Sequence, residues 1–300
     1  MGFPTTNALP ERATGRMRAA GECACCGNTM TDGGRQIKRC AACGFLTASF
    51  DPGFGRSVQG LGPLQAENDR VTLDEIRRQL GTGRKRLLDI GSGEGGFLAA
   101  ATVQGFDAVG VEPAPAGDAG AASGNFVHRS CFPQHPQGEH HLSVYDAVTF
   151  NHTFEHLPDP VAAAAAASRL LRLGGVAAFQ LPSSSGFLFR LARKLVGLGF
   201  ASPWDMLWQK DLPSPHVTYF NPANLCPLLE RETELRPAVC RRLRSVRVAG
   251  LWRRIRCRYP LPTAVALFVP TLAACPLLSL LPPDFVLLVY AKTALSGGDG

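Results

Sequence analysis

The sequence predicts an α/β protein whose parallel sheet is covered by helices on both faces and is preceded by a small metal-binding ribbon. Strand-like and helix-like segments alternate from about residue 66 onward, as in parallel sheets joined by helical crossovers. The first clear strand runs into a glycine-rich turn at residues 91–96. Two C-x2-C pairs stand near the N-terminus, with the spacing of metal ligands.

Several segments carry strand signals, and others carry helix signals. The expected strands are residues 86–90, 107–112, 125–128, 145–151, 176–181, 243–248 and 285–291. The expected helices are residues 94–104, 161–172 and 221–229. Gly105 is placed to end the first helix, and Asp159 with Pro160 to begin the second. The pair Gly174-Gly175 is expected to end that second helix.

Composition shifts divide the chain into stretches. We expect a flexible leader over residues 1–21, a cysteine-rich ribbon over 22–50, a Gly/Pro-rich linker over 51–65, a sheet-and-helix domain over 66–258, an apolar proline-rich insertion over 259–283, and a last strand and tail over 284–300. The length of the chain suggests one large domain with additions, or two modest domains.

The chain of 300 residues is 45% hydrophobic and has a net charge of +7. It is long enough to bury a sizeable core. The basic balance is compatible with nucleic acid, an anionic membrane or acidic substrates, and equally with a solvated surface that has no partner. Residues 1–21 lack the apolar core of a signal peptide, which predicts a cytoplasmic protein whose cysteines are thiols or metal ligands.

The insertion at residues 259–283 contains no charged side chain and is long enough to cross a bilayer. Prolines interrupt it, and proline breaks helical hydrogen bonding. These prolines are Pro260, Pro262, Pro270, Pro276, Pro282 and Pro283. The pattern favours a buried or interfacial segment over a transmembrane helix, and leaves open a peripheral membrane contact.

The glycine-rich turn is the strongest functional signal. Gly91, Gly93 and Gly95 permit a tight strand-to-helix turn and let a ligand approach the backbone closely. Glu112 ends the next strand, about twenty residues further on, where a carboxylate accepts hydrogen bonds from both hydroxyls of a ribose. The sequence therefore predicts a ligand that contains a ribose.

The charge around this turn distinguishes between two such ligands. With Gly96 the turn also satisfies the dinucleotide-binding pattern. However, Asp89 at the strand end and Glu94 at the helix start would repel a pyrophosphate on the helix N-terminus. S-adenosylmethionine instead carries a positive sulfonium and an ammonium, so nearby carboxylates favour it.

Four motifs in order extend this interpretation over residues 86–182. They are Leu-Asp-Ile-Gly-Ser-Gly-Glu-Gly, Val-Gly-Val-Glu-Pro, Asn-His-Thr-Phe-Glu-His-Leu-Pro-Asp-Pro and Leu-Leu-Arg-Leu-Gly-Gly-Val. Together they resemble the class I S-adenosylmethionine-dependent methyltransferases, whose sheet is Rossmann-like. The segment His-Val-Thr-Tyr-Phe-Asn-Pro, from residue 216, is similar to a later segment of many small-molecule members.

The resemblance implies roles for particular residues. Asp89, Gly91 and Gly93, with Ser92 and Gly95 in the same loop, would line the methionine end of the cofactor. Glu112 would hold the ribose, and Asn151 and His152 would lie beside the cofactor and its reactive methyl group. Where the family often has a polar residue that recognises the adenine amino group, this chain has Arg-Ser-Cys-Phe, so Ser130 is the candidate there.

The two C-x2-C pairs predict a structural zinc site. Cys23 and Cys26 form one pair and Cys40 and Cys43 the other, and a glycine follows each pair, as in zinc knuckles. Four thiolates favour zinc and fill its coordination sphere, so the site is expected to stabilise the fold rather than to take part in catalysis. Cys25 fits neither pair and is left as a spare thiol.

Methyl transfer also requires a base near the reactive methyl group in many enzymes. His156 is our first candidate, and His216 the second, because histidine has a pKa suited to this task. His152 and Tyr219 are further candidates, from the same two segments. Local packing is the alternative role for each of these residues.

A zinc ribbon joined to such a domain resembles the deoxysugar methyltransferases and, less closely, ribosomal-RNA guanine methyltransferases. The chain has no aromatic and basic stripe for stacking bases, which argues against nucleic acid. We therefore expect a small-molecule acceptor, such as a sugar or another biosynthetic intermediate. A lipid or quinone acceptor, an RNA acceptor and a cofactor-binding module without catalysis stay open as alternatives.

Overall fold

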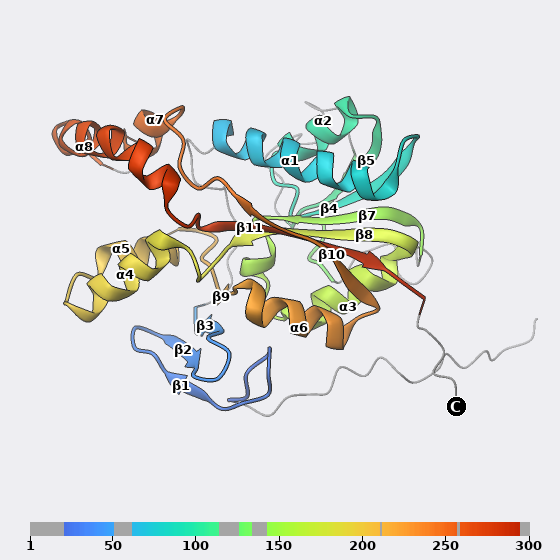
Figure 1. The fold of residues 1–300 in the computed structure, drawn as a ribbon, viewed down its shortest axis with the longest axis horizontal. Coiled ribbons are helices and arrows are strands. Elements are labelled where there is room, and N and C mark those ends of the chain that lie inside the picture. The colour runs from blue at the N-terminus through green and yellow to red at the C-terminus, as the bar shows by residue number, and fades with distance from the viewer. Residues whose placement is uncertain are drawn as a thin grey trace, which may run out of the picture.

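Figure 1 shows a computed structural model of the protein, which describes residues 21–50, 62–113, 126–133, 143–210, 212–256 and 259–294. The predicted leader and linker lie almost entirely outside these residues. The strands are β1 (Met30–Asp32), β2 (Ile37–Cys40), β3 (Leu46–Ala48), β4 (Lys85–Ile90), β5 (Phe106–Val111), β6 (Phe126–His128), β7 (Tyr145–Asn151), β8 (Leu171–Pro182), β9 (Thr218–Tyr219), β10 (Leu235–Leu243) and β11 (Phe285–Lys292). The helices are α1 (Gly62–Leu80), α2 (Gly96–Val103), the short 3-10 helix η2 (Phe154–His156), α3 (Pro160–Leu170), α4 (Phe187–Gly197), α5 (Ser202–Leu207), α6 (Pro222–Glu232), α7 (Leu251–Arg256) and α8 (Leu261–Leu280).

A seven-stranded sheet forms the centre of the molecule, in the order β10-β11-β8-β7-β4-β5-β6. Strands β4 to β8 are mutually parallel, and β11 runs antiparallel to both of its neighbours. From β4 the chain continues to β5 on one side, and β7 is added on the other side. In such sheets a crevice opens at the carboxyl ends of the strands where the direction of winding reverses. The β4/β7 pair is that position here.

Helices cover both faces of this sheet, which confirms the predicted fold class (Figure 1). Side chains alternate along β4, so that Leu87 and Leu88 enter different core clusters. Leu87 packs with residues of α1 and α2, such as Leu73 and Leu98, whereas Leu88 packs with the alanines of α3 and the leucines of α6. Burial of both faces makes the central strands rich in apolar residues, which is why the sequence predicts them.

The predicted helix ends are largely confirmed. Gly105 has φ +80° directly after α2, as expected of a residue that ends a helix. The Asp159 side chain accepts a hydrogen bond from the Ala162 backbone N–H at 2.9 Å, so Asp159 caps α3. Asn221 caps α6 by a reciprocal exchange of hydrogen bonds with Asn224.

Two boundaries differ from the prediction. Helix α3 ends at Leu170 rather than at residue 172, and β8 begins at once, so Gly174-Gly175 lies inside a strand. The register between β7 and β8 shifts there, and the pair occupies the irregular part of the strand. The strand predicted at residues 243–248 is also wrong, because the strand present is β10, which ends at Leu243. Most β10 side chains are exposed at the sheet edge, so they lack the apolar pattern that marks a strand.

The N-terminal ribbon is a small antiparallel sheet that includes a strand from the main domain. Its order is β1-β2-β3-β9, and β9 comes from the segment that contains His216. Helix α6 holds both cysteine turns of the ribbon, because Arg231 donates to the Cys25 carbonyl at 2.8 Å and Asn224 to the Cys43 carbonyl at 3.2 Å. The ribbon is therefore attached to α6 and, through β9, to the segment that contains His216.

The apolar insertion forms helix α8, despite Pro270 and Pro276 in its interior. Of its residues only Ala264 and Cys275 are buried, so the helix is not a core element. The sequence left burial and an interfacial position open, and the structure rules out burial within this chain.

Candidate functional site

Polar side chains converge at the carboxyl ends of β4 and β7. The Asp89 carboxylate is buried and accepts hydrogen bonds from the Thr149 hydroxyl at 2.7 Å and from the Asn151 amide at 2.8 Å. Burial raises the pKa of Asp89 to about 7, although these two hydrogen bonds act in the opposite direction. Asp89 and Asn151 therefore form one polar unit across two neighbouring strands.

The glycine loop lies over this unit and is tied to the next strand. The Gly91 N–H donates to the Val111 carbonyl at 2.7 Å, and the Gly93 N–H donates to the Glu112 carboxylate at 3.0 Å. Gly91 has φ +75°, and a Cβ there would lie 2.2 Å from the Thr153 hydroxyl, so only glycine fits. Asp89 and Glu112 thus flank the same loop, as the sequence predicted for a ribose-containing cation.

The accessible backbone of this loop and the unpaired polar atoms near it fit S-adenosylmethionine. Gly93 has φ +53°, and no heavy atom lies within 4 Å of the position its Cβ would take, so its backbone is accessible to a ligand. The Ser92 hydroxyl and the Asn151 amide oxygen are buried without hydrogen-bond partners among the described residues. Gly95, at φ +81°, precedes α2 without a side-chain cap. Hydrogen-bond donors, acceptors and carboxylates are thus all present for a ligand with a ribose and an amino acid end.

The adenine end of the site is less fully described. Ser130 follows β6, and its hydroxyl donates to the Cys131 carbonyl at 3.4 Å. The neighbouring segments 114–125 and 134–142, which follow β5 and β6, lie outside the described residues. The predicted contact between Ser130 and adenine therefore stays a prediction.

His152 directly follows β7 and has a left-handed backbone conformation, with φ +53°. Non-glycine residues rarely adopt this conformation, and it concentrates at functional sites. The His152 ring packs edge-on against Phe285 of β11 at 4.8 Å, and its Nδ1 lies 3.7 Å from the Glu155 carboxylate. The turn at His152 thus joins the carboxyl end of β7 to the segment that begins at Glu155.

Three residues of this region, Asp69, Thr72 and Gln180, were missed by the sequence analysis. Asp69 of α1 is partly buried, and this desolvation raises its pKa to about 6, although the nearby His152 and Gln180 side chains act in the opposite direction. The Thr72 hydroxyl of the same helix donates to the Gln180 side chain at 2.8 Å. Helix α1 was not predicted, and nothing in its sequence marks Asp69 as part of a site.

Glu155, His156 and His216 form a compact cluster. One potential ligand atom from each lies within 4.8 Å of the others, and the two imidazole rings are 4.8 Å apart. Both Glu155 oxygens are buried without hydrogen-bond partners among the described residues. A buried carboxylate is costly unless a cation or a proton donor balances it. This set is chemically suited to share a proton, and it has the donor atoms of a metal site.

A backbone carbonyl orients the His156 ring, and burial sets the charge of His216. The His156 Nδ1 lies 2.8 Å from the Pro215 carbonyl oxygen, which can only accept, so Nδ1 donates and Nε2 keeps its lone pair. Burial and the proximity of His156 lower the pKa of His216 to about 3, so His216 is neutral. Burial alone would raise the pKa of Glu155, but the nearby His152 and His156 side chains hold it below its usual value. Glu155 is therefore ionised beside a neutral His216.

Tyr219 lies next to His216, and its hydroxyl bonds to the backbone. Its hydroxyl donates to the Leu207 carbonyl at 3.3 Å, and its ring packs among Phe189, Trp208 and His216. Burial raises its pKa well above the usual value. The catalytic role predicted for Tyr219 therefore stays a prediction.

The ribbon sheet holds the His216 segment against Glu155. The Ala48 N–H of β3 donates to the Val217 carbonyl at 2.8 Å, and the Val217 N–H donates to the Glu155 carbonyl at 2.9 Å. The Thr47 hydroxyl also donates to the Val217 carbonyl, at 3.1 Å. Residue 217 is therefore hydrogen-bonded to the ribbon on one side and to η2 on the other.

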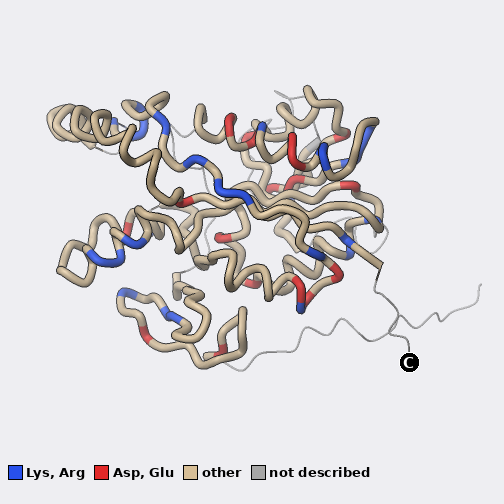
Figure 2. Tube along the Cα trace, viewed as in Figure 1, with Lys and Arg blue, Asp and Glu red and all other residues tan. Residues whose placement is uncertain are grey.

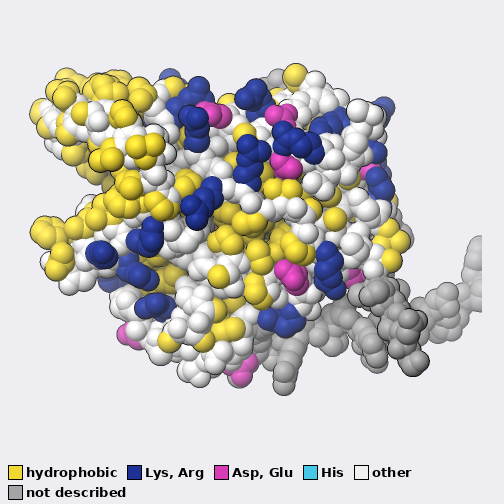
Figure 3. All heavy atoms as spheres, in the orientation of Figure 1, with side chains coloured by type: hydrophobic (Ala, Val, Ile, Leu, Met, Phe, Trp, Pro, Cys, Tyr) yellow, Lys and Arg dark blue, Asp and Glu magenta, His cyan; other side chains and the backbone are white. Residues whose placement is uncertain are grey.

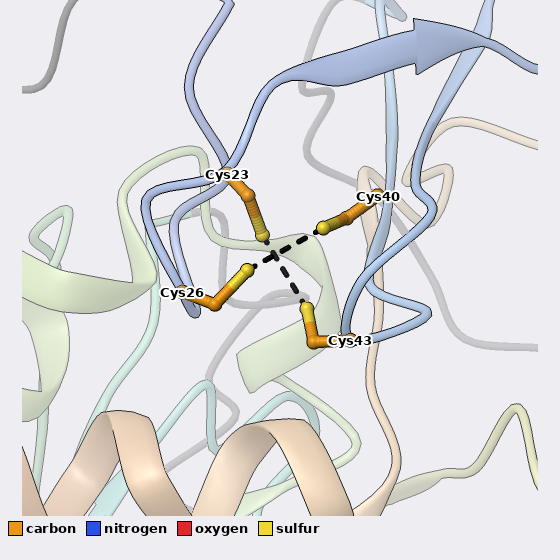
Figure 4. Close-up of side chains that lie close together, drawn as sticks. All are labelled: Cys23, Cys26, Cys40 and Cys43. Atoms are coloured by element: carbon orange, nitrogen blue, oxygen red, sulfur yellow. Dashed lines mark hydrogen bonds between the residues drawn. The ribbon is translucent and has the colours of Figure 1, made fainter.

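The four predicted cysteines converge at one end of the ribbon (Figure 4). The Sγ atoms of Cys23 and Cys43 are 3.5 Å apart, and those of Cys26 and Cys40 are 3.4 Å apart. Zinc with four ligands at about 2.3 Å requires sulfur atoms roughly 3.8 Å apart, so these residues fit zinc with a small outward adjustment. The Asn28 side chain donates to the Cys26 sulfur at 3.3 Å, as outer residues do around metal-bound thiolates. Cys25 stands outside this set, and a hydrogen bond to Cys23 raises the pKa of its thiol.

Comparisons with known proteins agree with this geometry. A family profile described as a methyltransferase domain matches residues 64–232. No curated protein sequence matches the chain. Among solved structures, a geranyl diphosphate methyltransferase in complex with S-adenosylmethionine superposes with a TM-score of 0.51 at 17% identity, over 78% of this chain and 87% of its own.

Two further structures share the fold at similar distance. A phosphoethanolamine N-methyltransferase from Haemonchus contortus has a TM-score of 0.51 at 13% identity, over 79% of this chain and 58% of its own. The 4+2 cyclase SpnF has a TM-score of 0.50 at 14% identity, over 83% of this chain and 89% of its own. These likenesses establish the fold only. The family match covers more than half of the chain and includes the glycine loop, the β7 edge and the His216 segment, so this protein belongs to the methyltransferase-domain family and is a class I S-adenosylmethionine-dependent methyltransferase.

Proposed function

We propose that the enzyme transfers a methyl group to a small molecule and that His156 removes the proton of the acceptor. The observation that carries the proposal is the Glu155–His156–His216 cluster directly after the β7 edge. The His156 tautomer is fixed with Nε2 as a base, and an ionised Glu155 beside it stabilises the imidazolium that forms. His216, neutral and weakly basic, fills the remaining side of the cluster.

The reaction then proceeds as a direct displacement. The acceptor nucleophile forms a bond to the methyl carbon, the bond from that carbon to sulfur breaks, and its electron pair stays on sulfur. The acceptor proton moves to Nε2 of His156. The products are the methylated acceptor, S-adenosylhomocysteine and the proton that His156 later releases to solvent. The protein contributes alignment and a base, which together account for most of the acceleration in such reactions.

We assign cofactor-binding roles to the polar residues at the carboxyl ends of the strands. We assign Glu112 to the ribose hydroxyls, and Asp89 with Asn151 to the positively charged methionine end. Ser92, Gly93 and Gly95 present the loop backbone to the same ligand, and Ser130 is assigned to adenine. His152 is assigned to the edge of the methyl-transfer site, where its unusual backbone conformation directs it.

We also propose that zinc occupies the four-cysteine site and stabilises the ribbon. The supporting observation is the convergence of the four sulfur atoms, which reach the spacing of tetrahedral coordination with a small outward adjustment. Four thiolates leave no open position, so the metal acts by holding β3, and through β3 the His216 segment, in place.

A small acceptor is favoured over RNA by two observations. Two of the structural neighbours are named for small phosphorylated compounds, geranyl diphosphate and phosphoethanolamine. Among the described residues near the basic side chains of α4 and α7, the exposed aromatic residues are Phe200 and Trp252, which are fewer than the row of aromatic side chains on which bases stack.

The acceptor class is tested with S-adenosylmethionine labelled in its methyl group. The purified enzyme is incubated with the RNA, protein and small-molecule fractions of a cell extract, and a sample without enzyme gives the background. We expect label in the small-molecule fraction, whether water-soluble or organic-soluble. Label incorporated into RNA or protein, with none in small molecules, would refute the assignment.

A further inference from the structure

Helix α8 exposes an apolar surface that a soluble domain rarely tolerates. It is 20 residues long, or about 30 Å, and is apolar enough by length and composition to cross a membrane. Leu280 is 83% exposed, and Leu277 and Val269 are 64% exposed each. Side chains of this kind cover the projecting helix in Figure 3. Contiguous apolar surface of this extent marks an interaction site.

A second apolar projection lies at the same end of the molecule. It is the turn between α4 and α5, where Leu198 is 73% and Phe200 64% exposed (Figures 1 and 3). An apolar hollow of about 490 Å³ opens at this turn, lined by residues such as Leu195 and Pro203. It lies away from the glycine loop. The two projections therefore form one bipartite apolar surface, defined by α8 and by the α4–α5 turn.

Positive charge accompanies this surface. Helix α4 carries Arg190, Arg193 and Lys194, and α7, which leads into α8, carries Arg253 and Arg256. Neither of these helices has an acidic residue, and α8 has no charged residue at all. Figure 2 shows basic segments along α4 in one projection and in α7 beside the other. Apolar side chains beside exposed arginines and lysines match the interfacial region of an anionic bilayer.

Both projections start at the end of the sheet where the parallel strands have their carboxyl ends. Helix α4 follows the carboxyl end of β8, and α8 ends just before β11. The Phe187 N–H donates to the Pro282 carbonyl at 2.9 Å, and the Phe189 N–H donates to the Asp284 carboxylate at 3.0 Å. Phe285, the next residue, contacts the His152 ring. The bipartite apolar surface therefore adjoins the methyl-transfer site.

We propose that the bipartite apolar surface docks into one leaflet of an anionic lipid bilayer, and that the acceptor carries an apolar chain held in that leaflet. The second half of the proposal rests on the proposed function and specifies its substrate class. The polar end of such an acceptor reaches His156 while its chain stays among the lipids. Docking is interfacial, because β10 before the insertion and β11 after it pair in one sheet and so lie on one side of the membrane.

A second copy of the chain is the less suitable occupant. Pairing two such surfaces would bring the arginines and lysines of α4 and α7 on each copy toward one another, with no acidic residue on α4, α7 or α8 to balance them. Anionic headgroups supply that balancing charge, and acyl chains cover α8.

Vesicle flotation with the purified full-length enzyme tests the docking. We expect binding to vesicles of phosphatidylcholine with 30% phosphatidylglycerol, and weak binding to phosphatidylcholine alone or at high salt. The double substitution Leu277→Asn and Leu280→Asn should lower the partition coefficient about tenfold or more, as should Phe200→Asn combined with Leu198→Asn. Val103→Asn, which changes an 89% exposed residue of α2 away from this surface, should leave binding unchanged.

Contrary results are distinguishable from failure of the proposed function. A protein that does not bind anionic vesicles, or that forms dimers in sedimentation which Leu277→Asn and Leu280→Asn dissociate, would overturn the docking proposal. Methyl label confined to the water-soluble small-molecule fraction would overturn the lipid-chain acceptor, yet leave the proposed function intact. Vesicle binding without any binding of S-adenosylmethionine would refute the proposed function and leave the docking surface standing.

Discussion

We expect the His156→Ala enzyme to lose about 10²- to 10⁴-fold in kcat while its affinity for S-adenosylmethionine is unchanged. The loss follows from removal of the one cluster nitrogen that is fixed as a base, since His156 Nδ1 is already engaged by the Pro215 carbonyl. Steady-state kinetics and calorimetry on the same preparation measure the two quantities.

Tyr219→Phe is the matched control for this prediction. It removes the hydroxyl that donates to Leu207 but keeps the ring against His216, so kcat should change less than about threefold. An undiminished kcat in His156→Ala would show that deprotonation occurs elsewhere or that none is needed. A large loss in Tyr219→Phe would return Tyr219 to the list of catalytic candidates.

We expect Cys40→Ser to abolish zinc binding and to lower kcat by about 100-fold or more, while S-adenosylmethionine still binds. Structural zinc contributes its binding free energy directly to the folding of small ribbons. Without zinc, we expect β3 to lose its position. The hydrogen bonds from β3 to Val217 are then lost, and His216 is no longer held beside Glu155. The cofactor loop lies on the main sheet and does not depend on the ribbon.

Metal analysis, kcat and calorimetry on this variant make the test, with Cys240→Ser as control because Cys240 is exposed on β10. The control should keep one zinc and full turnover. A wild-type enzyme without zinc would remove the metal from the account. A Cys40→Ser enzyme that lacks zinc but keeps its kcat would show that the ribbon does not position the catalytic segment.

The parts of the fold that the sequence predicts are those with local causes. Strands β4 and β7 are buried over most of their length and are therefore rich in apolar residues, and the turn at Gly91 needs glycine for steric reasons. The cap formed by Asp159 is likewise local. Strand β10 was misplaced because its stability comes from pairing with β11 rather than from its own pattern.

The candidate site was predictable only in part, because its partners are distant in sequence. The spacing of Asp89 and Glu112 reveals the cofactor loop, since both end neighbouring strands. In contrast, the contact of His216 with Glu155 depends on β9 joining the ribbon sheet, a pairing that its two residues do not signal. The role of Asp69 depends on how α1 packs, which no local pattern shows.

The central claim is that the glycine loop and its two carboxylates bind a positively charged adenosyl ligand. Calorimetry on the wild-type and Glu112→Gln enzymes tests it, with S-adenosylmethionine and NAD as ligands. The wild type should bind S-adenosylmethionine and not NAD, and Glu112→Gln should bind it about 10- to 100-fold more weakly. Because Asp89 has a pKa near 7 and acts as a carboxylate, affinity should also fall as the pH is lowered from 8 to 6. Binding of NAD alone, or equal affinity for S-adenosylmethionine in both enzymes at both pH values, would contradict the account.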